Sequence, residues 1–294
     1  MTVVYGSVLG YRPLYLDLYQ PVSVAQPPVV LFVHGGGWAL GDRTLAGPAF
    51  PGRSLFERLS AAGFAVASAD YRLTAEAVFP AQLHDVKAAI RWLRRHADEY
   101  GFDGSRIVVW GESAGAHLAA LAGLTGDSGN QFLEGSVAEP PAGPPVPGGS
   151  PDAVDDVSTA VSGVVDWYGV TDLVALARVT SAGPGPAEHD SPASPEGGLI
   201  GGQVSGHPDL ARAASPVTYA NAAAPPFLIM HGTADTGVPV AQGQALAAAL
   251  TRAGAGTVET EWVEDANHMW LGIPAARIEE LFDRSVAFVR KVTS

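Results

Sequence analysis

Residues 107–124 read IVVWGESAGAHLAALAGL, and this stretch says most about the fold. Its first four residues are apolar and predict a buried strand, whereas the alanine- and leucine-rich part predicts a helix. Between them stands GESAG (residues 111–115), which fits the Gly-x-Ser-x-Gly pattern of a tight strand-to-helix turn. Such a turn holds the serine hydroxyl at the carboxyl end of a strand, beside a helix N-terminus that favours negative charge. The stretch therefore predicts a nucleophilic serine at Ser113.

Strands and helices alternate along the rest of the chain. Continuous apolar runs predict further strands at 28–33, 64–68, 161–167, 227–230 and 258–263. Helical spacing of apolar residues predicts helices at 81–100, 240–250 and 275–292. Two short alternating segments within residues 3–19 predict an antiparallel hairpin at a sheet edge. We expect an α/β fold in which helices cover both faces of a mostly parallel sheet.

Two segments interrupt this alternation, at residues 126–156 and 181–206. Both are rich in Gly, Pro, Ser and Ala, so they are expected to be loose insertions that bury little apolar surface. We expect a small cap to arise from them. The length of the chain suits one domain with a buried core, and we assign residues 1–294 to a single domain.

A run of glycines follows the predicted strand at 28–33. The sequence HGGGW (residues 34–38) allows the backbone to come close to a ligand. A tetrahedral intermediate of acyl transfer carries negative charge on its oxygen, and backbone N–H groups aimed at that oxygen stabilise it. The N–H groups of Gly36, Gly37 and Ala114, the residue after the predicted nucleophile, are our candidates for this oxyanion hole.

A serine hydroxyl needs an adjacent base in order to attack. In folds with such a serine turn, an acid and then a histidine follow the serine along the chain. Of the eight histidines, only His268 lies after the last predicted acid position, in the loop that follows strand 258–263. Asp235 follows strand 227–230 and would orient the imidazole and stabilise the imidazolium. Three weaker candidates for the acid are Asp172, Glu264 and Asp265.

Together these residues resemble the hormone-sensitive-lipase-like esterases of the α/β-hydrolase superfamily. The matching stretches are HGGGW (34–38), DYRL (70–73), GESAG (111–115), HGTAD (231–235) and His268. The resemblance is strongest to the compact bacterial branch that includes feruloyl- and acetyl-xylan-esterase-like enzymes. Two further stretches of this chain, FPAQ (79–82) and ASPV (214–217), also resemble that branch. It implies ester hydrolysis through an acyl-enzyme, with no metal and no organic cofactor.

We expect a small-molecule substrate, either a short-chain or an aryl ester. Four aromatic residues, Trp38, Trp167, Tyr168 and Trp270, are candidates to line its pocket, although simple core packing explains each of them equally well. Two other functions stay open. A kynurenine formamidase-type amidohydrolase shares a glycine loop ending in Trp and the same triad. A non-catalytic ligand binder can also use this fold.

Composition narrows the partners. The chain has 17 Lys+Arg against 30 Asp+Glu, and this acidic balance repels phosphate backbones and anionic lipids, so we expect neither nucleic acid nor membrane partners. Arg91, Arg94 and Arg95 are expected to lie on a solvated helix face. The absence of cysteine excludes disulfides and thiolate nucleophiles. The first residues do not resemble a signal peptide, so we expect either a cytoplasmic protein or a mature form whose leader was removed.

Overall fold

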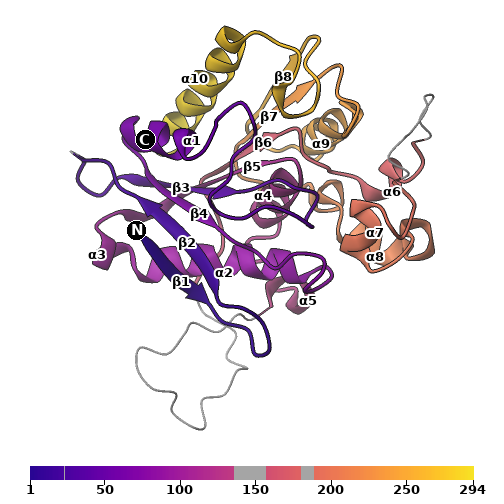
Figure 1. Ribbon diagram of the computed structural model, residues 1–294, viewed down its shortest axis with the longest axis horizontal. Helices are drawn as coiled ribbons and strands as arrows, with labels where there is room; N and C mark the ends of the chain where they lie inside the picture. Colours follow the sequence, from indigo (N-terminus) through magenta and orange to yellow (C-terminus); the bar gives the residue numbers. More distant parts are fainter. Residues whose placement is uncertain (23, 136–156, 180–188) are drawn as a thin grey trace.

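The computed structural model describes residues 1–22, 24–135, 157–179 and 189–294, and its centre is an eight-stranded sheet (Figure 1). The strand order is β1-β2-β4-β3-β5-β6-β7-β8. The strands are β1 (Thr2–Gly6), β2 (Leu14–Tyr19), β3 (Pro28–Val33), β4 (Ala65–Ala69), β5 (Asp103–Glu112), β6 (Gly163–Trp167), β7 (Phe227–Gly232) and β8 (Val258–Val263). β1 and β4 pair with β2 in antiparallel fashion, whereas the pairs from β4 across to β8 are parallel. The predicted mostly parallel sheet with an antiparallel N-terminal hairpin is confirmed.

Helices cover both faces of the sheet. One face packs against α1 (Ser54–Ala61) and α10 (Ala275–Val292), and the other against α2 (Ala81–Arg95), α4 (Ala114–Leu124) and α9 (Ala241–Arg252). Successive strand residues point to opposite faces. Accordingly, Leu31 of β3 lies in the core beneath α2 and α4, and Phe32 lies in the core beneath α1 and α10. The predicted helix 81–100 is divided at His96, after which α3 (Ala97–Tyr100) begins.

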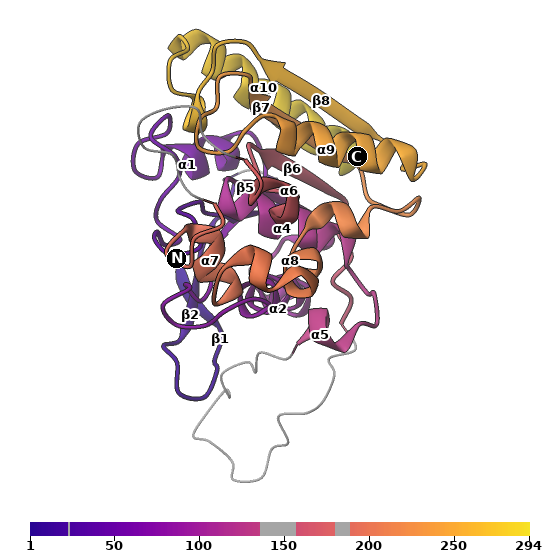
Figure 2. The same cartoon turned by 90° about the vertical axis from the view of Figure 1, so that its right-hand side faces the viewer.

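Residues 189–219, called the cap segment below, lie over one end of the sheet. Short helices fold together there, next to α6 (Leu173–Leu176), as Figure 2 shows. They are α7 (Pro195–Ile200), η1 (Val204–Gly206), α8 (Pro208–Ala213) and η2 (Pro216–Tyr219). The Ser194 side chain caps α7 by accepting the N–H of Gly197 at 2.9 Å, and Pro195 suits its first turn.

The cap segment corrects part of one prediction. The stretch 181–206 was expected to be loose, yet its described part, residues 189–206, is ordered and buries Leu199, Ile200 and Val204 almost completely. A few apolar residues and one helix cap are enough to fold it, because it packs on an existing core. Residues 136–156 and 181–188 of the predicted insertions lie outside the described residues.

The prediction that Arg91 lies on a solvated face of α2 was wrong. α5 (Gln131–Glu134), which follows α4, covers this face. Arg91 is buried there and forms an ion pair with Glu134 at 2.8 Å, which also binds the fully buried Lys87 at 2.8 Å. Arg94 donates to the carbonyl of Gly104 at 3.1 Å. Helical spacing of charges alone does not reveal a neighbouring segment that supplies a counter-charge.

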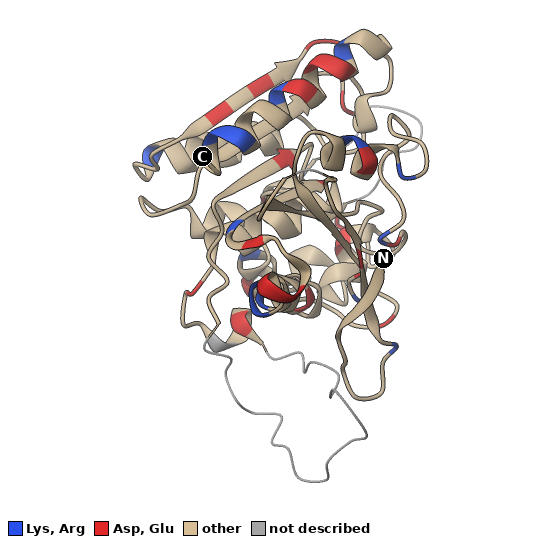
Figure 3. Cartoon of the chain, turned by 90° about the vertical axis from the view of Figure 1, so that its left-hand side faces the viewer, with Lys and Arg blue, Asp and Glu red and all other residues tan. Residues whose placement is uncertain are grey.

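The charged residues of the edge strand β8 have partners on α10. Figure 3 shows acidic positions of β8 beside basic positions of α10. Glu261 pairs with Arg277 and Arg284, and Glu259 pairs with Lys291 at 2.8 Å. Charges on an edge strand oppose pairing with another chain. Among the described helices, none has both the length and the apolar character needed to cross a membrane.

Candidate active site

Two loops meet where the strand order of the sheet reverses. The chain passes from β3 to β4 on one side, and β5 pairs with β3 on the other side. Ligands of open α/β sheets bind at the carboxyl ends of strands at such a switch point. The glycine loop 34–38 follows β3, and Ser113 follows β5. A Cβ atom on Gly115 would lie 2.0 Å from the carbonyl oxygen of Val33, so only glycine lets the first turn of α4 approach β3.

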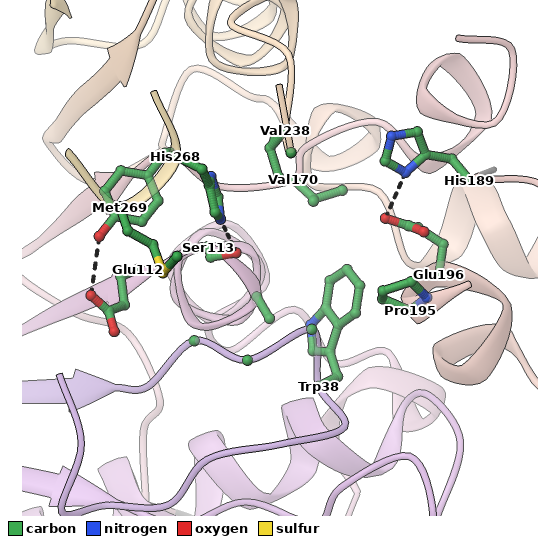
Figure 4. Close-up of a pocket in the computed structure, with 16 residues that line it drawn as sticks. Trp38, Glu112, Ser113, Val170, His189, Pro195, Glu196, Val238, His268 and Met269 are labelled. Carbon is green, nitrogen blue, oxygen red and sulfur yellow. Dashed lines mark hydrogen bonds and ion pairs between the residues drawn. The ribbon is translucent and has the colours of Figure 1, made fainter. Parts of the chain in front are cut away.

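Ser113 has the strained backbone that its motif predicts. Its φ of 52° and ψ of −120° place it at the N-cap of α4, in a region that non-glycine residues rarely adopt. The N–H of Ser113 donates to the carbonyl of Trp167 at 2.9 Å, which fixes the turn against β6. The hydroxyl projects into a cavity rather than into the helix, as Figure 4 shows.

A continuous hydrogen-bond chain joins the three predicted residues. The Nε2 atom of His268 lies 2.9 Å from the hydroxyl oxygen of Ser113 (Figure 4). The Nδ1 atom of His268 lies 2.7 Å from Oδ2 of Asp235. The other oxygen of Asp235 accepts the backbone N–H groups of Gly237 at 2.9 Å and Val238 at 2.8 Å. In this arrangement the imidazole can take the serine proton while the carboxylate faces the opposite ring nitrogen.

Asp235 stays ionised because of its hydrogen-bond partners. Burial by itself would raise its pKa, but the hydrogen bonds from His231 and His268 outweigh burial and lower the pKa to about 2. The Nε2 atom of His231 lies 3.4 Å from Oδ2 of Asp235 and donates to the carbonyl of Val238 at 2.7 Å. A carboxylate with so low a pKa remains negatively charged at neutral pH, as orientation of a neutral imidazole requires.

The three weaker candidates for the acid have other surroundings. Asp172 caps α6 by accepting the N–H of Ala175 at 2.9 Å. Glu264 and Asp265 are exposed to solvent. Sequence reasoning missed Asn267, whose side-chain oxygen accepts the N–H of His268 at 2.7 Å and that of Thr236 at 3.0 Å. Asn267 thereby ties the loop of the histidine to the loop of the acid, and its place beside His268 was the available signal.

The candidate amide donors border the same cavity as Ser113. Gly36 has a φ of +105°, and a Cβ atom there would lie 2.2 Å from the carbonyl oxygen of Leu40, so this position requires glycine. Gly37 also has a positive φ, of +60°. Ala114 is the first residue of α4, so its N–H has no acceptor within the helix. The three residues whose N–H groups are the candidate donors thus border the cavity that holds the serine hydroxyl.

The cavity has a volume of about 350 Å³ and mostly apolar walls. It is lined by Gly35, Gly36, Gly37, Trp38, Glu112, Ser113, Ala114, Tyr168, Val170, His189, Pro195, Glu196, Gly237, Val238, His268 and Met269. Within the described ranges, no group of three or more His, Asp or Glu side chains could hold a metal ion.

Two of the four aromatic residues predicted to line the pocket do so, Trp38 and Tyr168, and two do not. Trp167 is fully buried on the α10 face, where its Nε1 donates to Ser285 at 3.1 Å. Trp270 packs edge-on against Trp167, with ring centroids 5.5 Å apart. Neighbouring residues at a strand end point to opposite faces, and the sequence does not say which of the two faces the pocket.

Trp38 forms a fixed wall of the cavity. Its Nε1–H donates to Nδ1 of His117 at 3.2 Å, and Nε2 of His117 lies 2.6 Å from the carbonyl of Ala214. Burial lowers the pKa of His117 to about 4, against the opposing effect of its hydrogen bond to Ala214. His117 is therefore neutral at pH 7, and its unprotonated Nδ1 can accept from Trp38.

Sequence reasoning also missed acidic residues on opposite sides of the cavity (Figure 4). Glu112 lies on one side, where its Oε2 accepts the N–H of Gly47 at 3.0 Å and the hydroxyl of Tyr168 at 3.1 Å. Burial raises its pKa, and these hydrogen bonds oppose the rise. Glu196 of the cap segment lies on the other side and pairs with Nδ1 of His189 at 3.1 Å. Glu112 is part of the GESAG motif, whereas His189 and Glu196 fall in a stretch that was expected to be loose.

Two known proteins of similar sequence have the name esterase. Esterase LipQ of Mycobacterium tuberculosis is 34% identical over 263 residues, which cover 88% of this chain and 55% of LipQ. Esterase LipC of the same organism is 34% identical over 215 residues, which cover 73% of this chain and 46% of LipC. The chain thus spans about half the length of the curated relatives it matches.

Solved structures match over nearly the full length. A truncated form of a carbohydrate esterase from gut microbiota is 28% identical, with a TM-score of 0.79, over 100% of this chain and 96% of that one. Thermogutta terrifontis esterase 2 with bound propionate is 25% identical, with a TM-score of 0.72, over 99% of this chain and 94% of that one. The BD-FAE family model matches residues 16–250. The chain belongs to the BD-FAE family and has the α/β-hydrolase fold of the hormone-sensitive-lipase-like esterases.

Proposed function

We propose that the protein is a serine carboxylic ester hydrolase that acts through an acyl-enzyme on small-molecule esters. The observation that carries this proposal is the hydrogen-bond chain from Ser113 through His268 to Asp235, which opens on a cavity bordered by backbone donors. Relatives named as esterases support the same reaction class. We assign Ser113 as the nucleophile, His268 as the base and Asp235 as the acid that orients it.

The first step forms the acyl-enzyme. His268 takes the proton of Ser113 while the serine oxygen bonds to the carbonyl carbon of the ester. The electron pair of the C=O bond moves to the oxygen, and the N–H groups of Gly36, Gly37 and Ala114 stabilise this charge. When the C–O bond to the alcohol breaks, His268 returns the proton to the leaving oxygen.

The second step releases the acid. A water molecule replaces the alcohol, and His268 takes one of its protons as the water oxygen attacks the acyl carbon. The tetrahedral intermediate collapses, its bond to Ser113 breaks, and the serine oxygen recovers the proton from His268. Asp235 remains ionised throughout and stabilises the imidazolium of each step, which its pKa of about 2 permits.

The size of the cavity supports a small substrate. About 350 Å³ lies at the small end of the range for ligand pockets, which favours a short acyl group or a single aromatic ring. Trp38, Val170 and Val238 give it apolar walls. The structural relative solved with propionate bound also suits a short acyl group. The cytoplasmic location and the lack of nucleic-acid and membrane partners stay predictions.

Hydrolysis of p-nitrophenyl acetate tests the proposal. Ser113→Ala removes the nucleophile, and we expect kcat to fall by at least about 10⁴-fold. Ser60→Ala on α1, outside the cavity, serves as the matched control. A Ser113→Ala protein with nearly wild-type activity would refute the assignment. N-formylkynurenine, assayed in parallel, distinguishes an esterase from a formamidase-type amidohydrolase, and a non-catalytic binder would turn over neither compound.

A further inference from the structure

Trp38 contributes the largest side chain that borders the cavity, and its indole points into the space between Ser113 and Pro195 (Figure 4). The residue directly follows Gly36 and Gly37, whose N–H groups are candidate oxyanion donors. Its φ of 57° is one that non-glycine residues rarely adopt. Such a conformation costs free energy and persists only where surrounding contacts hold it. The contacts of Trp38 therefore matter for the shape of the site.

The backbone and the side chain of Trp38 are held separately. The N–H of Thr74 donates to the carbonyl of Trp38 at 2.9 Å, which holds the backbone. The indole Nε1–H donates to Nδ1 of His117 at 3.2 Å, and the two rings pack edge-on with centroids 4.9 Å apart. Nε2 of His117 lies 2.6 Å from the carbonyl oxygen of Ala214, which can only accept, so Nε2 carries the proton and Nδ1 is the acceptor. A contact from the cap segment thus fixes the tautomer that Trp38 needs.

His117 joins three parts of the site from behind. It lies one turn beyond Ser113 on α4, where its N–H donates to the carbonyl of Ser113 at 3.1 Å. Its imidazole is fully buried between the glycine loop and the cap segment, through Trp38 and Ala214. Among the described residues, Trp38 borders the cavity and His117 does not. His117 can therefore influence a substrate only through a neighbour.

We propose that His117 is a positioning residue that fixes the Trp38 indole through Nδ1 and thereby limits the size of the ester group that the cavity accepts. This inference rests on the proposed ester hydrolysis and adds the origin of its selectivity for small substrates. Without the acceptor, the indole N–H would be buried and unpaired, which is costly. The ring then turns away to find another partner, and the cavity admits a larger group.

Asparagine and leucine at position 117 are a matched pair of substitutions. Their side chains have nearly the same shape, and both lose the hydrogen bond to Ala214. In asparagine, Oδ1 takes the place of the imidazole Nδ1 and accepts the indole N–H, whereas leucine offers no acceptor. His117→Asn should therefore keep the selectivity of the wild type, and His117→Leu should lose it. A merely structural role of His117 gives no reason for asparagine to restore selectivity.

Two pairs of esters measure the size limit. For the acyl side, we compare p-nitrophenyl acetate with p-nitrophenyl octanoate, and for the alcohol side, phenyl acetate with 4-phenylphenyl acetate. In at least one pair, the ratio of kcat/KM for the smaller ester to that for the larger ester should fall about fivefold in His117→Leu, as expected for loss of one hydrogen bond. In His117→Asn the same ratio should stay within about twofold of wild type. His207→Leu, at an exposed histidine of the cap segment, is the control and should leave both ratios unchanged.

Combination with Trp38→Phe tests whether His117 acts through the indole. Phenylalanine has no N–H, so in a Trp38→Phe protein the difference between asparagine and leucine at position 117 should disappear. A difference that persists there means that His117 acts through another neighbour, and it overturns the inference. Equal ratios for His117→Asn and His117→Leu in the presence of Trp38 overturn it as well.

Circular dichroism checks the folding of each variant. If the variants at position 117 do not fold, Trp38→Phe alone decides, because it keeps His117 and removes the indole N–H. A fall of either ratio in that protein supports the inference, and unchanged ratios in both pairs overturn it. If the wild type hydrolyses none of these esters, the proposed function itself fails, which differs from an active wild type whose ratios do not respond.

Discussion

Asp166 and Asp235 lie at the ends of neighbouring strands, yet the pKa values of their carboxyl groups are shifted in opposite directions. Burial raises the pKa of Asp166 to about 6, opposed by the backbone N–H of Gly169. Its Oδ2 is buried and without a hydrogen-bond partner among the described residues. The imidazoles of His231 and His268 lower the pKa of Asp235 to about 2 despite burial. Partners, rather than burial, therefore make Asp235 the suitable acid.

Replacing this carboxylate tests its role. Asp235→Asn keeps the size of the side chain but removes the charge that orients and stabilises the imidazole of His268. We expect kcat for p-nitrophenyl acetate to fall by about 10³- to 10⁴-fold. Asp265→Asn is the matched control because Asp265 is exposed, and Asn tolerates its φ of 59°. An Asp235→Asn protein within tenfold of wild type would show that another group supports His268.

At the level of elements, the loop after β3 depends on its backbone conformation. Gly36→Ala would place a Cβ atom 2.2 Å from the carbonyl oxygen of Leu40, so the loop must shift. We expect kcat to fall by about 10²- to 10³-fold because a donor to the oxyanion is displaced. The measurement is kcat on p-nitrophenyl acetate, with circular dichroism to check folding.

Gly10→Ala is the control for this substitution. Gly10 has a similarly unusual φ of +87°, and nothing within 4 Å would meet its Cβ atom. It lies in the turn between β1 and β2, remote in the chain from the glycine loop. If Gly10→Ala reduced kcat as strongly as Gly36→Ala, backbone strain in general, rather than displacement of a donor, would explain the loss.

For the molecule as a whole, the sequence predicted the frame and the central residues of the site. Ser113, His268 and Asp235 follow predicted strands, and the carboxyl ends of parallel strands meet at one edge. What it did not reveal is which way side chains face and what covers them. Trp167 and Tyr168 are adjacent, and only the structure shows that Tyr168 borders the cavity. Arg91 and Glu196 are buried because each has a polar partner, and hydrophobic patterns do not detect such partners.

Asp166 also affects the stability of the whole fold. A carboxyl group whose pKa is raised to about 6 in the folded state binds its proton more tightly there than in the unfolded chain. The contribution of Asp166 to the free energy of unfolding should therefore fall as pH rises from about 4 to about 6, by up to about 3 kcal/mol. Asp166→Asn removes that dependence. The free energy of unfolding of the variant should therefore increase relative to that of the wild type over this pH interval.

Urea unfolding at pH 4 and pH 7 measures this difference, with the exposed Asp209→Asn as control. The difference between Asp166→Asn and wild type should grow with pH, whereas the difference for Asp209→Asn should change little. A difference for Asp166→Asn that stays constant or shrinks as pH rises would mean that Asp166 has no raised pKa in the folded protein.

Covalent labelling with a fluorophosphonate, read by peptide mass spectrometry, tests the assignment of the nucleophile most directly. The reagent bonds to a serine oxygen only where a base takes its proton and donors stabilise the new charge. We expect one adduct on the peptide that contains Ser113, no adduct in Ser113→Ala, and much slower labelling in His268→Ala. Labelling at another residue, or a wild-type protein that the reagent leaves unmodified, would contradict the assignment of Ser113 as an activated nucleophile.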